Sequence, residues 1–172
     1  DLHCSVHSFP TRRSSDLIAW GRSTELFMGM LEITRGKTEK EEFQLPVRNI
    51  AEAAAKEGLY CPGSLIRTRL ISEHPLTQGM PGEIGVFYRG RPIFTTSIPS
   101  WDMDRRVIGW FPEKELLLSG YVEKAEKLSN KNNLVWLRKG KGQLVLFAFN
   151  PQYRAATPVT YKLLFNALVL KQ

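Results

Sequence analysis

Three polar side chains follow the last apolar strand predicted in the chain, and they are the residues best placed to bind a ligand. Asn150, Gln152 and Arg154 come directly after the predicted strand Leu144–Phe149. Because ligands of α/β proteins bind where strands end, we expect these side chains to cluster in one crevice. Carboxamides and a guanidinium can together recognise a carboxylate or an amide group. In the alternative, Arg154 pairs with an acidic neighbour or with the C-terminal helix.

Residues suited to catalysis or metal binding are scarce. A carboxamide such as that of Asn150 cannot accept a proton near neutral pH as an imidazole does. Beyond residue 17 the chain holds one cysteine, Cys61, and one histidine, His74. Each stands next to a proline in a predicted turn, so we interpret Cys61 as a packed residue and His74 as a turn residue. An ordinary zinc site needs three or four protein ligands, so we predict no catalytic residue and no metal ligand.

The charge balance is basic, with a net charge of +7 over 172 residues. The cations are spread in short pairs, without a basic stripe along a helix or interleaved aromatic residues. We therefore expect a solvated surface and no nucleic-acid partner. No apolar run approaches the roughly 18 residues that a membrane span requires. The basic pairs are Arg67 with Arg69, Arg89 with Arg91, Arg105 with Arg106, and Lys139 with Lys141.

Strands and helices are both predicted along the chain, a mixture that favours a layered α/β fold. Ser23 is expected to begin a short helix, residues 34–44 to form an exposed connection, and residues 138–142 to turn a hairpin. An apolar helix, which Thr157 caps, is expected from Val159 to Leu170. Further strands are expected over 18–20, 64–71, 84–88, 93–96, 106–111, 116–121, 134–137 and 144–149, and further helices over 50–57, capped by Asn49, and 123–128.

The segment Gly140–Arg154 resembles the last strand of a class I glutamine-amidotransferase-like domain. In active members of that superfamily the strand leads into Phe-His-Pro-Glu, in which the His is the general base and the Glu orients it. The matching residues here are Phe149-Asn150-Pro151-Gln152. The resemblance implies a flavodoxin-like, three-layer α/β sandwich. It also implies a pseudo-enzyme, because two carboxamides replace the base and its orienting carboxylate.

A longer series of short segments resembles the C-terminal region of bacterial zinc-carboxypeptidase-family proteins, where an amidotransferase-like domain follows the metallopeptidase domain. The resemblance implies a non-catalytic accessory domain whose partner is the missing N-terminal peptidase domain. Zinc would be bound in that domain, with no cofactor in this chain, and an exported or periplasmic location is compatible with the family. The alternatives are a free-standing amidotransferase-like enzyme and a small-ligand-binding domain. The segments are 45–49, 60–65, 74–76, 79–81, 117–120, 149–154 and 162–168.

The beginning of the chain has a different origin in our interpretation. His7–Leu17 reads HSFPTRRSSDL, which resembles a translated high-throughput sequencing adapter. Segments of this kind are left out of fold reasoning. We therefore expect residues 1–17 to be an artefact and residues 18–172 to be a partial amidotransferase-like domain, truncated at its N-terminus.

Overall fold

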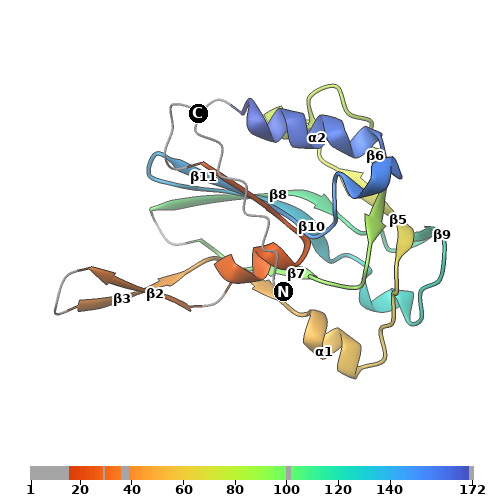
Figure 1. The fold of residues 1–172 in the computed structure, drawn as a ribbon, viewed down its shortest axis with the longest axis horizontal. Coiled ribbons are helices and arrows are strands. Elements are labelled where there is room, and N and C mark those ends of the chain that lie inside the picture. Colours follow the sequence, from red (N-terminus) through yellow and green to blue (C-terminus); the bar gives the residue numbers. More distant parts are fainter. Residues whose placement is uncertain (1–15, 29, 36–38, 100–101, 171–172) are drawn as a thin grey trace.

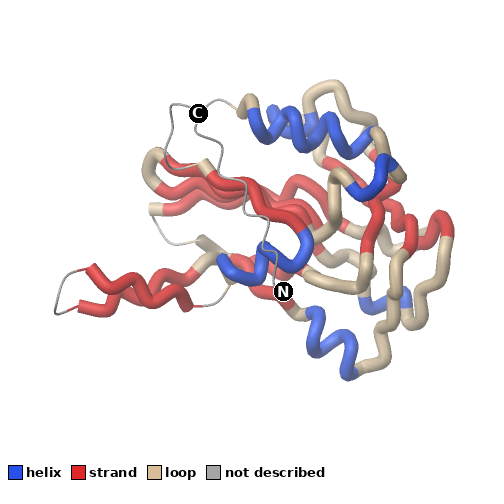
Figure 2. The backbone as a smooth tube through the Cα atoms, viewed as in Figure 1, coloured by secondary structure: helices blue, strands red, loops and turns tan. Residues whose placement is uncertain are grey.

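A mixed sheet with helices beside it forms the body of the protein in the computed structural model, which describes residues 16–28, 30–35, 39–99 and 102–170 (Figure 1). Strands dominate, and the helices are few and short (Figure 2). The strands are β1 (Leu17–Trp20), β2 (Met30–Arg35), β3 (Glu39–Gln44), β4 (Val47–Asn49), β5 (Ser64–Leu70), β6 (Glu83–Tyr88), β7 (Phe94–Thr96), β8 (Met103–Trp110), β9 (Leu117–Ser119), β10 (Asn132–Lys139) and β11 (Gly142–Phe147). The helices are α1 (Ala51–Lys56) and α2 (Val159–Leu168), with the 3₁₀ helices η1 (Gly21–Phe27), η2 (Pro75–Thr77), η3 (Ala125–Lys127) and η4 (Tyr153–Ala155).

The described strands form a nine-stranded sheet in the order β1-β11-β10-β8-β5-β6, to which β4, β7 and β9 add at the side. Only β1 and β11 are parallel among the described strand pairs; the others are antiparallel. The predicted mixed α/β class is confirmed. A doubly wound parallel sheet is not what these strands form, because parallel neighbours need long helical crossovers and most strands here follow one another without a helix between them.

Helices lie on two sides of the sheet. Figure 1 shows α2 above the strands β8, β10 and β11 and α1 below them. Helix α2 buries Leu163 and Ala167, and α1 buries Ala51 and Ala54. Asn49 precedes α1 and its Oδ1 accepts the backbone N–H groups of Ala51 and Ile93, each at 3.0 Å, which confirms the predicted cap. No helix in the described ranges has the length and apolar character to cross a membrane.

The predicted hairpin near the end of the chain is confirmed. Strands β10 and β11 pair from Leu134 with Phe147 to Lys139 with Gly142. The two-residue connection contains Gly140, whose φ of +56° lies in the left-handed region that glycine adopts without steric cost. Both strands are longer toward the turn than the apolar runs indicated, because polar residues continue the pairing where the core ends.

Two expectations for the first part of the chain were wrong. The segment 34–44 was expected to form an exposed connection, but its described residues, 34–35 and 39–44, belong to the ribbon of β2 and β3, which projects away from the sheet in Figure 1. A ribbon outside the core needs no alternation of apolar residues, so its sequence pattern looked like a loop; the backbone pairing runs from Met30 with Gln44 to Arg35 with Glu39. The helix expected to begin at Ser23 is the 3₁₀ helix η1, which begins at Gly21. Ser23 Oγ instead accepts the N–H of Trp20 at 3.1 Å and donates to its carbonyl at 2.7 Å.

The boundary proposed near residue 17 falls inside a strand. Leu17 begins β1 and stands opposite Leu144. The carboxylate of Asp16 accepts the backbone N–H of Gln143 at 3.1 Å. Residues 1–15 lie outside the described residues, so the adapter interpretation stays a prediction.

Candidate functional site

The ends of β1 and β11 place the candidate site. Because these two strands are parallel, their carboxyl ends lie at the same edge of the sheet. Gly21 follows β1 directly, and Ala148–Asn150 follows β11. The backbone N–H of Asn150 donates to the carbonyl of Phe87 in β6 at 3.4 Å, so a third strand reaches the same place. Three segments that are far apart in the sequence therefore meet here.

A cleft of about 310 Å³ opens between these segments. Its lining combines three guanidinium groups with a carboxamide and two aromatic rings, a composition suited to an anionic ligand with some apolar surface. The lining residues are Gly21, Arg22, Phe87, Arg89, Arg91, Ala148, Phe149 and Asn150.

The charges of the cleft are only partly compensated. Arg91 lies 3.4 Å from the carboxylate of Glu25, which also accepts a hydrogen bond from Asn49 at 3.0 Å. Arg22 and Arg89 are exposed, and neither forms an ion pair with any residue that the structure describes. Two guanidinium groups are therefore available to a negatively charged ligand in the cleft.

Gly21 holds the turn that brings η1 against Asn150. Its φ is +54°, a left-handed conformation that β1 needs in order to turn away at its end. A Cβ at this position would lie 2.7 Å from Oδ1 of Asn150. The carboxamide of Asn150 therefore packs directly on the glycine backbone, and a side chain at residue 21 would displace it.

The three residues expected to form the site are not equally placed. Asn150 lines the cleft, as expected, whereas Gln152 is exposed and lies outside the lining. The guanidinium of Arg154 lies 5.5 Å from the ring centre of Tyr153, and this ring stacks on Phe87 at 3.8 Å. Arg154 therefore does not line the cleft, and it is linked to the lining residue Phe87 only through the ring of Tyr153. It forms no ion pair with the described residues.

Sequence reasoning missed the arginines of the cleft. Arg89 and Arg91 were interpreted as one of several scattered basic pairs, and Arg22 was not singled out. The usable signal was their position, since Arg22, Arg89 and Asn150 each lie within three residues of the end of a strand. Their convergence depends on the pairing of β1 with β11, which the sequence did not show.

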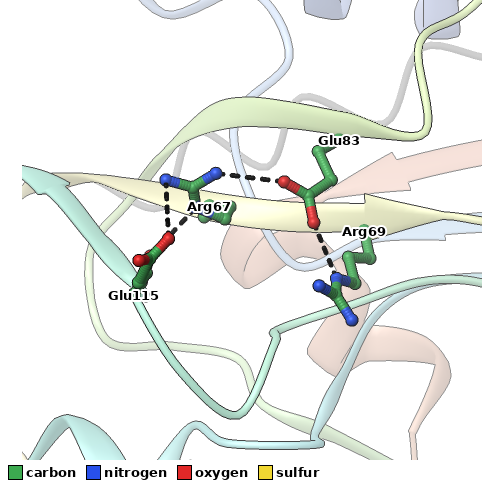
Figure 3. A network of polar contacts seen from close by, with 4 residues as sticks. All are labelled: Arg67, Arg69, Glu83 and Glu115. Carbon is green, nitrogen blue, oxygen red and sulfur yellow. Dashed lines mark hydrogen bonds and ion pairs between the residues drawn. The ribbon is translucent and has the colours of Figure 1, made fainter.

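The basic pair in β5 differs from the arginines of the cleft because its charges are neutralised (Figure 3). Arg67 lies 3.0 Å from Glu83 and 3.7 Å from Glu115, and Arg69 lies 2.7 Å from Glu83. Two arginines and two glutamates thus form one surface network. This agrees with the interpretation of the scattered basic pairs as solvated surface and leaves no free charge there for a ligand.

Cys61 and His74 have structural surroundings. Cys61 is buried, its Sγ donates to the carbonyl of Tyr88 at 3.5 Å, and burial raises the pKa of the thiol. His74 Nδ1 accepts the backbone N–H of Leu76 at 3.2 Å, which confirms the predicted turn role. In the described part of the chain, no three His, Cys, Asp or Glu side chains are grouped so that they could hold a metal ion.

Alkylation of Cys61 should be slow in the folded protein. A thiol must be deprotonated and accessible to react, and burial here opposes both. In a Cys4→Ser background, which leaves Cys61 as the one thiol of the chain, iodoacetamide labelling followed by mass spectrometry should be much slower without denaturant than in urea. Equal rates in both conditions would contradict the packed role of Cys61.

Comparison with protein-family models and with curated proteins found no match.

Proposed function

We propose that this chain is a non-catalytic ligand-binding domain whose cleft takes up the carboxylate group of a small molecule or peptide. The observation that carries the proposal is the convergence of Arg22 and Arg89, both without ion-pair partners among the described residues, beside the carboxamide of Asn150. Guanidinium groups bind carboxylates through paired hydrogen bonds, and a neighbouring carboxamide can add a further donor. The lining lacks an acid–base group with a pKa near neutrality, which is why we propose binding without turnover.

We further propose that the domain is an accessory part of a zinc metallocarboxypeptidase-family protein, with the peptidase domain as its partner and zinc bound only there. The ordered series of sequence segments supports this relation. So does the ligand chemistry, because every substrate and product of a carboxypeptidase carries a free terminal carboxylate. The finer amidotransferase-like assignment is supported by the sequence around Asn150 and by the C-terminal helix, whereas a mostly antiparallel sheet fits a flavodoxin-like sandwich poorly.

A matched pair of peptides tests the cleft. Acetyl-Ala-Ala with a free carboxylate should bind to the full chain, and its C-terminal amide should bind at least about tenfold more weakly, since one charge-assisted interaction is lost. The double variant Arg22→Gln/Arg89→Gln should reduce the affinity for the free acid by about tenfold or more. Isothermal titration calorimetry at low salt gives both comparisons.

The matched control is Arg48→Gln. This arginine is exposed on β4 and does not line the cleft, so its replacement changes the net charge without touching the site. The single variants Arg22→Gln and Arg89→Gln remove the same amount of charge as this control. If Arg48→Gln weakened the binding of the free acid as much as either of them, the effect would be general charge attraction and not a site. Peptide or glutamine hydrolysis by the purified chain would contradict the non-catalytic part of the proposal and favour a free-standing enzyme.

A further inference from the structure

A second cavity lies near the start of β11, at the opposite end of this strand from the arginine cleft. It measures about 450 Å³. The register of β8, β10 and β11 places Arg106 opposite Trp136, and Asp104 and Gln143 on either side of Arg138. Residues directly opposite in antiparallel strands share a face, so these five side chains line one side of the cavity. The segment Glu73–Pro75, Ile71 and Leu170 complete the lining.

Gln143 contributes a buried donor without an acceptor. The residue is 5% exposed, and its Oε1 accepts the indole N–H of Trp136 at 2.8 Å. This bond fixes the orientation of the side-chain amide and leaves its nitrogen, Nε2, as the unpaired donor. Nε2 has no hydrogen-bond partner within the described ranges. A buried donor left unpaired is costly, and such groups in native proteins are satisfied by a ligand or by ordered water.

The charges around the cavity favour a ligand with a single negative charge. The lining holds two positive charges, on Arg106 and Arg138, and two negative charges, on Glu73 and Asp104. The nitrogen and oxygen of the Arg138–Asp104 ion pair are 3.9 Å apart, a long distance for such a pair. Arg106 is exposed and forms no ion pair with the residues described. A dianion would meet two carboxylates, whereas a monoanion can use Arg106 alone.

His74 adds a neutral ring to this environment. Its Nδ1 accepts a hydrogen bond from Leu76, so the neutral imidazole carries its proton on Nε2. Burial lowers the pKa of His74, the nearby Arg106 lowers it further, and Asp104 opposes this. The ring centre lies 5.3 Å from that of Trp136. Together with Ile71, Pro75 and Leu170, these rings give the cavity an apolar wall that a carbon skeleton can cover.

We propose that this cavity binds a small monocarboxylate with an apolar body, whose oxygens accept hydrogen bonds from Nε2 of Gln143 and from the guanidinium of Arg106. The site is independent of the arginine cleft. Gln143 is the second residue of β11, whereas Asn150 lies three residues past its end. Either site can therefore fail its test without affecting the other.

Titration of the ¹⁵N-labelled full chain with benzoate tests the proposal by nuclear magnetic resonance. Benzoate should shift the side-chain amide of Gln143 and the indole N–H of Trp136 in a saturable way at millimolar concentration. Benzyl alcohol, which keeps the ring and loses the charge, and inorganic phosphate, which keeps the charge and loses the ring, should each bind at least about tenfold more weakly.

Two variants locate the interaction. Gln143→Glu keeps an oxygen for the indole N–H of Trp136 but replaces the free donor by a negative charge, so benzoate binding should fall by at least about tenfold; Gln78→Glu, at an exposed glutamine, is its control. Arg106→Gln should weaken benzoate by about fivefold, with Arg48→Gln as control. Because Arg106 is exposed, this second variant decides the matter if Gln143→Glu does not fold.

Three results would each overturn the proposal. The first is that benzoate leaves the signals of Gln143 and Trp136 unchanged, which would assign Nε2 to a water molecule. The second is saturation by benzyl alcohol or phosphate at the same concentrations as benzoate. The third is that Arg106→Gln and Arg48→Gln bind benzoate equally well.

Discussion

Replacing Phe147 with alanine is expected to lower the free energy of unfolding by about 3–5 kcal/mol. Phe147 is fully buried in β11 and stands between Trp20 of β1 and Leu134 of β10. Its ring also meets that of Phe149 edge to face, with 5.5 Å between the ring centres. The substitution removes a large apolar side chain from the middle of the sheet and leaves a cavity that the surrounding strands cannot close. Urea unfolding followed by circular dichroism measures the loss.

The same change at Phe165 is the control for this prediction. Phe165 lies on α2 and is 62% exposed, so Phe165→Ala should change the free energy of unfolding by less than about 1 kcal/mol. If both variants lost the same stability, the sheet described here would not be the core of the protein. The comparison matters for function because β11 carries Asn150 to the cleft, and a loosened β11 would move the carboxamide away from Arg22 and Arg89.

Local structure was predictable where short-range chemistry decides it. The hairpin at Gly140, the Asn49 cap and the helix after Thr157 each depend on residues within one turn of each other. The cap expected at Thr157 was wrong, because Pro158 is the N-cap of α2 without a side-chain cap bond, and the helix ends at Leu168 and not at Leu170. The apolar runs of β5, β6, β10 and β11 were recognised as strands, although their ends were displaced. The ribbon of β2 and β3 was missed because it lies outside the core, where polar residues can pair without leaving an apolar pattern.

The arrangement of the strands was not predictable from these local signals. The expectation of a flavodoxin-like sandwich, whose sheet is parallel, came from the resemblance around Asn150 and was extended to the whole chain. In the structure, one parallel pair, β1 with β11, joins residues that are more than a hundred positions apart, and the other described pairs are antiparallel. Nothing in the composition of Leu17–Trp20 specifies which strand it will join, since an apolar strand can be buried beside any other.

The candidate site shows the same division between local and long-range information. The position of Asn150 after the last strand was sufficient to place it at a ligand-accessible edge, because strand ends are local features. Arg22 and Arg89 come from two other segments, and their approach to Asn150 requires the β1–β11 pair and the contact with Phe87. Gln152 was expected in the site because it also follows the last predicted strand, yet the turn after Pro151 directs the chain toward η4 and leaves Gln152 exposed.

Gly120→Ala is expected to lower the free energy of unfolding by about 3 kcal/mol, because two separate costs combine at this residue. Gly120 has a φ of +100°, which an L-residue adopts only with strain. Its Cβ would also lie 2.7 Å from Oγ and 3.1 Å from the backbone Cα of Ser64. The hydroxyl of Ser64 donates to the carbonyl of Tyr121 at 2.7 Å and accepts its N–H at 3.0 Å, so the clash would open the link between β5 and the end of β9.

Two other glycines separate these costs in the same urea experiment. Gly140→Ala places an alanine at a positive φ of +56° but creates no close contact, so the free energy of unfolding should fall by about 1 kcal/mol. Gly82→Ala meets nothing within 4 Å and has no positive φ, so it should be neutral or slightly stabilising. The expected order of destabilisation is therefore Gly120, then Gly140, then Gly82. If Gly120→Ala were no worse than Gly140→Ala, the cost would lie in backbone strain alone, and the contact between Ser64 and Gly120 would be looser than the structure shows.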